Sequence, residues 1–485
     1  MMGIFRVLSL LALFAFAGLL QAQESCSNGD MRGDFATQPK GILTIGPFAG
    51  PFAATGIIHF DGAGRFEGVA TSSFNGSVIF PFDAVGSYSV TPDCILTIFE
   101  ETLRIGFEGI LSKTKNEVPL FQPQDATITT NVLRRLSISS CRDSDLRDDW
   151  VIQASGSNII TSGRFAQIGA LRFDGGGNVA GTTGSSVNGV IVYKTVRGTY
   201  RVQEDCTFSV RLTDETGALS HFYGTFFEDG SEFIFIYSDD GRVITGVAEQ
   251  SAAQSGCSNA DLRGDFSTQP IGIQTLGPFA GPFSAAGVIH FDGVGRFTGV
   301  ATSSFNGTII FPFAAFGTYR VTPDCFISTF EETLQIPFEG YLSKSKNEVY
   351  LFQPQDTTIT TNTLHRLQIS SCVDADLRDN WVIQASGSNI ITGGSFAEVG
   401  RLRFDGAGNV AGTTGSSLNG LIVRHEVSGT YSIQEDCTFS LSLTDENGDA
   451  SHIFGTFFGD GSEFALIYSD DGGVIPGTAR QAADY

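Results

Sequence analysis

The heptapeptide Phe60-Asp61-Gly62-Ala63-Gly64-Arg65-Phe66, FDGAGRF, recurs three more times, as FDGGGNV, FDGVGRF and FDGAGNV, starting at Phe173, Phe291 and Phe404. Apolar residues precede each copy, glycine accepts positive φ, and aspartate accepts hydrogen bonds inside tight turns. The motif therefore predicts a turn between two β-strands that the chain needs four times. In the alternative, the aspartate is a cation ligand, but the nonapeptide spacing of calcium-binding repeats is absent.

The eight cysteines indicate how the chain is organised. Each cysteine of the second half lies 231 residues after one of the first half, as Cys257 follows Cys26, and Cys26 lies 115 residues before Cys141. Repeats of this length predict whole domains in tandem, because solenoid repeats are much shorter. We expect a signal peptide and four modules with these ranges: signal peptide 1–22, module A 23–138, module B 139–253, module A′ 254–369 and module B′ 370–485.

Each module contains two cysteines, which predicts one disulfide per module in an exported chain. The expected pairs are Cys26 with Cys94, Cys141 with Cys206, Cys257 with Cys325, and Cys372 with Cys437. No cysteine has a histidine or another cysteine within a few residues, so we expect no metal site at these positions.

Alternating residues assign the strands of a module to an inner and an outer face. Asn75-Gly76 and its copies are hairpin turns. Ile58 and Phe60 are expected to point inward and His59 outward, since its counterparts in the other modules are Arg172, His290 and Arg403. In the next hairpin strand the expected inward residues are Val78, Phe80, Phe82, Ala84, Gly86 and Tyr88.

About eight strands per module in meander order predict an all-β protein of four small up-and-down antiparallel barrels. β-Sandwiches of similar strand count are the alternative. In a barrel, Cys26 and Cys94 fall at the same end, so the segment after Cys26 must cross the barrel floor as a short helical turn.

Each module resembles the lipocalins and other calycins in outline, and similar Gly- and Phe-rich repeats occur in exported bacterial proteins. The matching segments are Gly33-Asp34-Phe35, Asp148-Asp149-Trp150, Gly264-Asp265-Phe266 and Asp379-Asn380-Trp381. The resemblance implies a barrel whose lumen binds a small apolar ligand. No segment has both the glycine and the tryptophan of the lipocalin motif.

Charge and the first residues limit the partners and the location. The chain has 485 residues and a formal charge of −23, which disfavours nucleic acids and anionic membranes as partners. An apolar run before Ala22 is typical of a signal peptide, and no second apolar run follows. We expect a secreted, periplasmic or extracellular protein with no transmembrane segment in the mature chain.

No arrangement of residues indicates catalysis, a cofactor or a metal site. Lys194 and His425 occupy inward positions that hold Phe82 and Phe313 in modules A and A′. They are candidate ligand-binding residues at a wet lumen mouth, together with Trp150 and Trp381. The alternative is a long side chain that reaches out of the rim into water.

The sequence therefore favours a non-catalytic exported protein for multivalent binding or surface interaction. An alternative function is the binding of a small apolar ligand in the lumens, mainly those of modules B and B′. An enzyme on a calycin-like barrel is the third and least supported alternative. The expected partner is a small apolar ligand or a surface partner.

Overall fold

The computed structural model describes residues 25–46, 49–124, 126–160, 163–253, 256–278 and 280–483; the expected signal peptide lies outside them. The described chain forms four closed antiparallel barrels, so the barrel prediction is confirmed and the sandwich alternative is wrong. Short 3₁₀ turns interrupt the described strands: η1 (Asn28–Met31), η2 (Asp143–Asp145), η4 (Asn259–Leu262) and η5 (Asp374–Asp376).

Modules A and A′ are barrels whose first strand is interrupted. Module A contains β1 (Gly33–Thr37), β2 (Lys40–Leu43), β3 (Gly50–Phe60), β4 (Arg65–Phe74), β5 (Ser77–Val90), β6 (Ile95–Glu100), β7 (Ile105–Ile110), β8 (Glu117–Phe121) and β9 (Thr127–Arg135). Module A′ contains β18 (Gly264–Thr268), β19 (Ile271–Gln274), β20 (Gly281–Phe291), β21 (Arg296–Phe305), β22 (Thr308–Val321), β23 (Phe326–Glu331), β24 (Ile336–Leu342), β25 (Glu348–Phe352) and β26 (Thr358–Arg366). Strands β1 and β2 both pair with β3 and β9. They are two halves of one strand, separated at Pro39 because proline has no N–H to donate.

Modules B and B′ have an unbroken first strand. Module B contains β10 (Arg147–Asn158), β11 (Gly163–Asp174), β12 (Asn178–Val187), β13 (Val190–Val202), β14 (Thr207–Asp214), β15 (Leu219–Phe227), β16 (Glu232–Tyr237) and β17 (Arg242–Gln250). Module B′ contains β27 (Arg378–Asn389), β28 (Gly394–Asp405), β29 (Asn409–Leu418), β30 (Leu421–Ile433), β31 (Thr438–Asp445), β32 (Ala450–Phe458), β33 (Glu463–Tyr468), β34 (Gly473–Val474) and β35 (Pro476–Gln481). Counting interrupted strands once, every barrel is an eight-stranded meander.

The repeated heptapeptide is the turn between the second and third strands of each barrel. In module A, Oδ1 of Asp61 accepts hydrogen bonds from the backbone N–H groups of Ala63, Gly64 and Arg65 at 2.7, 2.9 and 3.0 Å. Gly62 and Gly64 have φ of +78° and +115°, which favours glycine. These hydrogen bonds lower the pKa of Asp61, the largest contribution coming from the Arg65 N–H. The turn geometry explains why the motif recurs in four barrels.

A β-bulge corrects one predicted set of inward residues. The pairing of β4 with β5 shifts between Ala70, which faces Phe82, and Ser72, which faces Ile79. Ile79 therefore packs inward against Phe52, Ala54 and Phe74, in place of Val78. The prediction for Val78 is wrong because the extra residue of the bulge reverses the alternation. The side chain of Phe80 lies outside the described set.

The floor of each barrel is closed by a disulfide and a 3₁₀ turn. The four predicted disulfides are confirmed: Cys26–Cys94, Cys141–Cys206, Cys257–Cys325 and Cys372–Cys437. In module A, η1 follows Cys26 and buries Met31 completely. Tyr88 Oη donates to the Asn28 carbonyl at 3.1 Å, and the Val90 N–H donates to Asn28 Oδ1 at 2.7 Å. The predicted crossing of the floor is thus confirmed.

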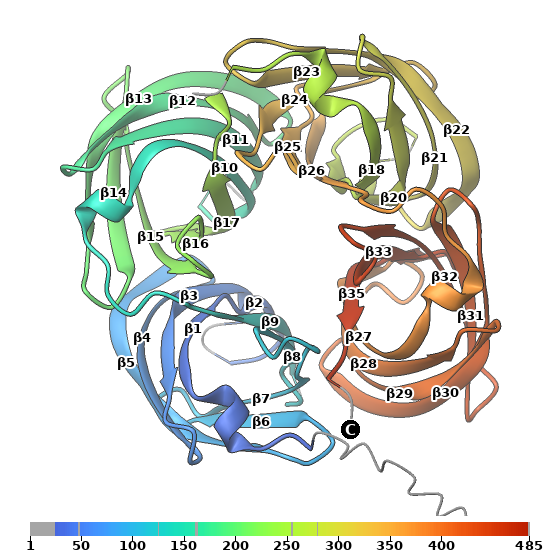
Figure 1. Ribbon diagram of the computed structural model, residues 1–485. Coiled ribbons are helices and arrows are strands. Elements are labelled where there is room, and N and C mark those ends of the chain that lie inside the picture. Colours follow the sequence, from blue (N-terminus) through green and yellow to red (C-terminus); the bar gives the residue numbers. More distant parts are fainter. Residues whose placement is uncertain are drawn as a thin grey trace, which may run out of the picture.

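The four barrels form a closed ring (Figure 1). Gln38 Nε2 of module A donates to the carbonyls of Phe235 and Gly246 in module B at 3.1 and 3.0 Å. The same pair of hydrogen bonds recurs from Gln153 to Leu351 and Asn362, from Gln269 to Leu466 and Gly477, and from Gln384 to Leu120 and Asn131. The last of these joins module B′ to module A, which closes the ring without a connecting peptide.

The Asn-Gly turns also belong to the contacts between barrels. The Gly241 N–H of module B donates to the Gly76 carbonyl of module A at 2.6 Å. A Cβ at Gly76 would lie 2.7 Å from Gly241 Cα, so this approach requires glycine. The turn of each barrel meets the next barrel in the same way, through Gly189 with Thr357, Gly307 with Gly472, and Gly420 with Ala126.

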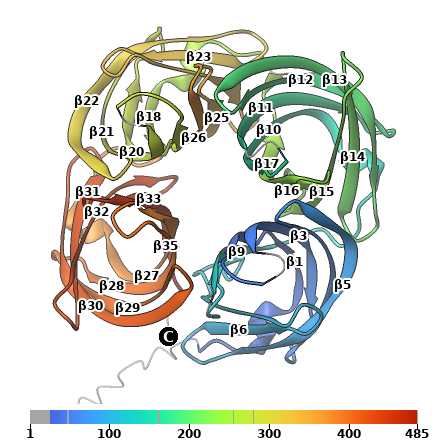
Figure 2. The ribbon, with the colours of Figure 1, turned by 180° about the vertical axis from the view of Figure 1, so that it is seen from behind.

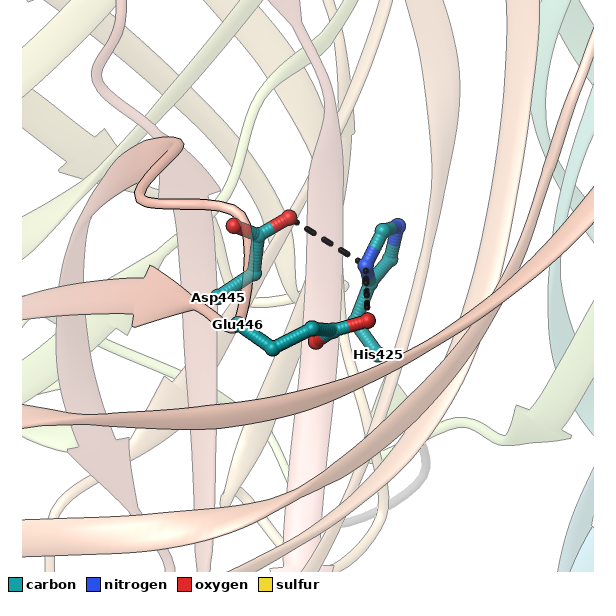
Figure 3. Close-up of side chains that lie close together, drawn as sticks. All are labelled: His425, Asp445 and Glu446. Atoms are coloured by element: carbon teal, nitrogen blue, oxygen red, sulfur yellow. Dashed lines mark hydrogen bonds and ion pairs between the residues drawn. The ribbon is translucent and has the colours of Figure 1, made fainter.

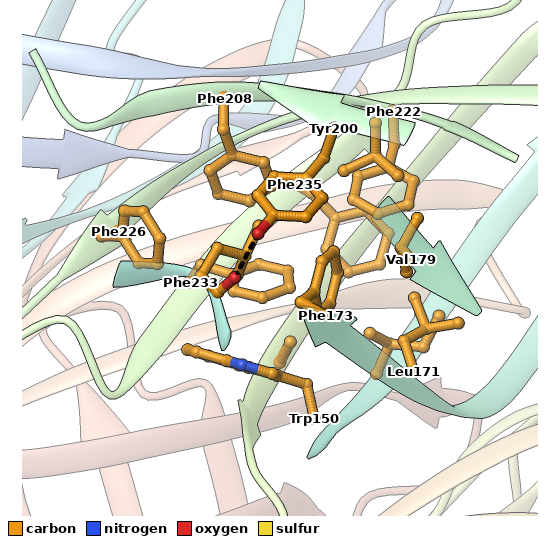
Figure 4. Packing of buried hydrophobic residues seen from close by; sticks show 14 of the residues in the cluster. Trp150, Leu171, Phe173, Val179, Tyr200, Phe208, Phe222, Phe226, Phe233 and Phe235 are labelled. Carbon is orange, nitrogen blue, oxygen red and sulfur yellow. Dashed lines mark hydrogen bonds between the residues drawn. The ribbon is translucent and has the colours of Figure 1, made fainter. Parts of the chain in front are cut away.

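Aromatic residues fill the closed half of each lumen. In module B they surround Trp150, whose ring lies 4.8 Å from that of Phe233 (Figure 4). Further members of this core are Phe173, Tyr200, Phe208, Phe222, Phe226 and Phe235. Aromatic side chains therefore fill the floor half of the module B barrel.

Candidate functional site

All four barrels open toward the same face of the ring. Each barrel contacts the next through equivalent residues, so one rotation relates successive barrels and their floors must share a face. The four 3₁₀ turns lie on the face toward the viewer in Figure 1, and Figure 2 shows the opposite face. We call this opposite face the mouth face, because the barrel ends without a 3₁₀ turn lie there.

The mouth face carries large apolar side chains that are exposed to solvent. Strand direction places there seven described side chains that are at least 60% exposed: Ile45, Ile160, Val190, Leu276, Phe311, Ile391 and Leu421. They come from all four modules. Each of these side chains is available for apolar contact with a partner on this face.

The lumens of modules A and A′ contain small apolar cavities. The cavity in module A has a volume of about 80 Å³ and is lined by Phe52, Phe60, Phe66, Phe82, Ala84 and Phe107, among others. The cavity in module A′ has a volume of about 90 Å³ and includes the counterparts Phe283, Phe291, Phe297, Phe313, Ala315 and Phe338. Each can accommodate a small apolar group but not a whole lipid.

The structure places Lys194 inside the mouth of module B. Its strand position faces Thr183 across the β12–β13 pair, on the same face as the lumen residues Val179 and Val196. The Lys194 ammonium group forms an ion pair and hydrogen bond with Oδ2 of Asp214, which is 5% exposed. This hydrogen bond is the largest cause that lowers the pKa of Asp214. Lys194 therefore neutralises a buried carboxylate at the lumen mouth.

His425 occupies the corresponding position in module B′, where it faces two carboxylates (Figure 3). Its Nδ1 lies 3.2 Å from Asp445 Oδ2 and 3.3 Å from Glu446 Oε1. Asp445 is the counterpart of Asp214, and Glu446 follows it in the turn after β31. The sequence did not indicate these carboxylates, because their distance from His425 along the chain follows no known motif.

A polar cavity of about 410 Å³ opens beside His425 in module B′. Glu398, which is 5% exposed, lines it and accepts a hydrogen bond from Tyr468 Oη. Burial raises the pKa of Glu398. Asp449, Asp470 and Asp471 line the same cavity, so the mouth of module B′ is strongly acidic.

Trp150 and Trp381 lie far from these mouth residues, at the barrel floors. Both side chains are 0% exposed, and their Nε1–H groups donate to the carbonyls of Arg147 and Arg378 at 2.8 and 2.9 Å. The structure thus brings neither tryptophan together with Lys194 or His425. A ligand-binding role for these four residues stays a prediction.

The four barrels also meet around the ring axis, where a second polar region is found. A cavity of about 780 Å³ is lined by residues of all four modules, including Lys40, Arg164, Thr361 and Ser388. Toward the floor face lies what we call the axial cluster: Glu117, Arg134, Glu228, Glu232, Glu249, Glu348, His365, Glu463 and Arg480.

Burial, together with neighbouring carboxylates, shifts the pKa values of carboxyl groups in the axial cluster. Burial, followed by the charge of Glu348, raises the pKa of both Glu232 and Glu249 to about 8. Burial opposes ionisation of Glu348 too, but the charge and hydrogen bond of His365 hold the pKa of Glu348 below its ordinary value. These shifts make the region where the barrels meet sensitive to pH.

The interface between modules B′ and A differs in charge from the equivalent interface between modules B and A′. Between modules B′ and A, Arg480 forms an ion pair with Glu117, and Arg424 forms a bidentate one with Glu108 at 2.8 and 2.6 Å. Between modules B and A′, Glu249 replaces Arg480 and approaches Tyr350 Oη at 3.4 Å. The interface that has no connecting peptide thus holds the additional ion pairs.

Comparison with known proteins assigns no family. No family model and no curated protein matches the chain. Among solved structures, the isotype 1 transferrin binding protein B from serogroup B Neisseria meningitidis matches with 9% identity and a TM-score of 0.22. The match covers 78% of this chain and 83% of that chain. At this TM-score the similarity supports no functional argument, whereas the closed strand pairing itself fits the calycin outline.

Within the described residues, no helix has the length and apolarity to cross a membrane.

Proposed function

We propose that this protein is an exported, non-catalytic binding protein that engages one partner through several barrel mouths. The observation that carries the proposal is the closed ring, which holds the four mouths on one face. One disulfide in each module supports export, because such bonds persist in oxidising compartments. The exposed apolar side chains of the mouth face support contact with a partner there.

The lumens of modules A and A′ are the preferred sites for apolar groups. Their cavities are lined by phenylalanine, whereas the mouth of module B′ carries several carboxylates. Three methylenes buried in one such cavity would contribute about 2.4 kcal/mol, which is weak binding for a single site. Two weak sites held by a rigid ring gain affinity when the partner bears several apolar groups. Our sequence-based expectation of apolar ligands mainly in modules B and B′ remains the alternative.

Alkyl groups test the proposal directly. Soluble 1-octanol, followed by saturation-transfer NMR, is expected to bind two equivalent sites, and an octyl-substituted dextran is expected to bind much more tightly. Ala84→Leu and Ala315→Leu fill one cavity each, because both alanines line the lumens and are almost fully buried. Each single variant should weaken dextran binding by about tenfold or more, and the double variant should abolish it.

Val85→Leu is the matched control, since Val85 is the next residue on β5 and is 37% exposed. It should leave both ligands unaffected. A single filled cavity that merely halves dextran binding would contradict multivalency. Absence of 1-octanol binding would contradict the apolar lumen sites.

A further inference from the structure

We propose that His425, Asp445 and Glu446 bind a divalent transition-metal ion of the zinc type at the mouth of the module B′ lumen. One imidazole nitrogen and two carboxylate oxygens from these residues lie within 4.8 Å of one another. They form the one group of at least three potential metal ligands in the part of the chain that the structure describes. Mixed nitrogen and oxygen donors are suited to zinc and its neighbours rather than to calcium or magnesium.

The distances from His425 to the two carboxylates match those of a tetrahedral site. Ligands about 2.0–2.2 Å from a zinc ion lie roughly 3.4 Å from each other when the geometry is tetrahedral. The observed separations from His425 Nδ1 are 3.2 Å to Asp445 Oδ2 and 3.3 Å to Glu446 Oε1. Small side-chain movements would therefore suffice to bring all three atoms to bonding distance.

Backbone groups hold both carboxylates in this orientation. Oδ1 of Asp445 accepts hydrogen bonds from the N–H groups of Asn447 and Asp449 at 2.8 and 2.9 Å, while Oδ2 faces His425. Oε2 of Glu446 accepts from the Glu426 N–H at 2.9 Å, while Oε1 faces His425. One oxygen of each carboxylate is thus fixed by the protein and the other is directed at the imidazole.

The copy of this site in module B contains a cation of its own. There the Lys194 ammonium group binds Asp214, and the Thr195 N–H holds Glu215 Oε2 at 2.9 Å as Glu426 holds Glu446. The backbone contact of the glutamate is thus retained in both modules, and in module B the Lys194 ammonium group occupies the place of the His425 imidazole beside the aspartate. Replacement of lysine by histidine in module B′ removes the permanent charge and supplies a metal ligand in its place.

The surroundings favour a cation and leave space on one side. The adjoining cavity of about 410 Å³ is lined by further carboxylates, including Glu398 and Asp470. With three protein ligands, the metal would retain a coordination position for water or a donor group of a ligand in this cavity. The side chain of His425 is only 24% exposed, so the ion would be held at the mouth and not on the outer surface.

Calorimetric titration of the metal-free full-length protein with zinc chloride tests the site. We expect one equivalent to bind with micromolar or tighter affinity. His425→Ala should abolish this binding. Glu446 is an exposed turn residue, and Glu446→Gln should weaken zinc binding by at least tenfold. Circular dichroism of each variant checks the fold, and the exposed position of Glu446 keeps the test valid if His425→Ala does not fold.

Two further variants make the test specific. Lys194→His should create a second equivalent, because Asp214 and Glu215 are already in place. His290→Ala should change nothing, since His290 lies 2.7 Å from Asp265 but belongs to no group of three ligands in the described part of the chain. The proposal is overturned if zinc does not saturate at one equivalent. His425, Asp445 and Glu446 would then form only an ion-paired cluster. It is also overturned if Glu446→Gln binds like the unaltered chain, or if Lys194→His still binds a single equivalent.

Discussion

Single residue differences between the two halves of the duplication change the chemistry of equivalent positions. Lys194 corresponds to His425, and Glu249 corresponds to Arg480. In each case the neighbouring carboxylates are retained while the residue that faces them differs: histidine replaces lysine at one position, and arginine replaces glutamate at the other. The duplicated scaffold therefore carries four related barrels with different local electrostatics.

At this scale, Glu232 in the axial cluster makes stability depend on pH. Its pKa in the folded protein is about 8, against an ordinary value of 4.5, because of burial and the nearby carboxylates of Glu348, Glu228 and Glu249; Arg134 opposes the shift. Between these values the folded chain keeps a proton that the unfolded chain releases. Its contribution to stability is complete below about pH 4.5 and is lost as the pH rises through 8.

Glu232→Gln removes this proton linkage. At pH 8.5 its melting temperature should exceed that of the unaltered chain by about 2–4 °C, and at pH 4 the two should agree. Thermal unfolding followed by circular dichroism across this range gives the comparison, with the exposed carboxylate variant Glu204→Gln as control. If the melting temperature of Glu232→Gln changed with pH in the same way as that of the unaltered chain, the linkage would be ruled out.

At the scale of strands, the abundance of glycine and phenylalanine has one structural cause. Phe66 on β4 pairs with Gly86 on β5, and the Phe66 ring covers the glycine. The same arrangement recurs for Phe297 over Gly317, Phe208 over Gly224, and Phe439 over Gly455. A glycine lets the neighbouring strand bend sharply, and the ring restores the apolar area that the missing side chain leaves open.

Gly86→Ala should therefore destabilise module A. The added Cβ would lie 2.1 Å from the Phe99 carbonyl oxygen and 2.5 Å from the Phe66 ring, and overpacking of this kind costs about 1–3 kcal/mol. Gly106→Ala on β7 is the matched control, because its Cβ meets nothing closer than 3.7 Å. Hydrogen exchange should become faster in module A for Gly86→Ala alone. Equal protection in both variants would show that the covered glycine is not needed.

At the scale of the whole molecule, ring closure depends on the interface between modules B′ and A. The other three interfaces join modules that follow each other in the chain, whereas this one is held only by non-covalent contacts. It keeps the Gln384 hydrogen bonds common to all interfaces and adds the ion pairs Arg424–Glu108 and Arg480–Glu117. Surface ion pairs contribute little singly, about 0.2–1 kcal/mol, but here they act where no peptide assists.

Arg424→Glu should loosen the ring at this interface. Like charges would then face each other, and the Ala126 N–H, which donates to the Gly420 carbonyl at 2.9 Å, should exchange about three to ten times faster. Adding Glu108→Arg should restore protection, because the charges are then exchanged rather than opposed. Arg403→Glu, an exposed charge change in the same module, is the control. Failure of the double variant to restore protection would exclude the ion pair as the cause.

The sequence alone determined the properties that depend on local pattern and on duplication. The four turns, the disulfide pairs, the floor crossing after Cys26 and the inward positions of Lys194 and His425 all follow from strand alternation and cysteine spacing. Alternation has a fixed period of two, so it can be followed from a turn along each strand until a bulge such as that after Ala70 reverses it.

How the barrels meet depends on contacts between strands that lie far apart in the chain. Ala36 and Phe121 alternate with inward residues and would be assigned to solvent, yet they are 0% and 2% exposed because neighbouring barrels cover them. The glutamines that join the barrels, the axial cluster and the carboxylates beside His425 likewise come together from distant strands. Alternation separates two faces of a strand but does not reveal what covers the outer one, because that depends on the packing of whole barrels against each other.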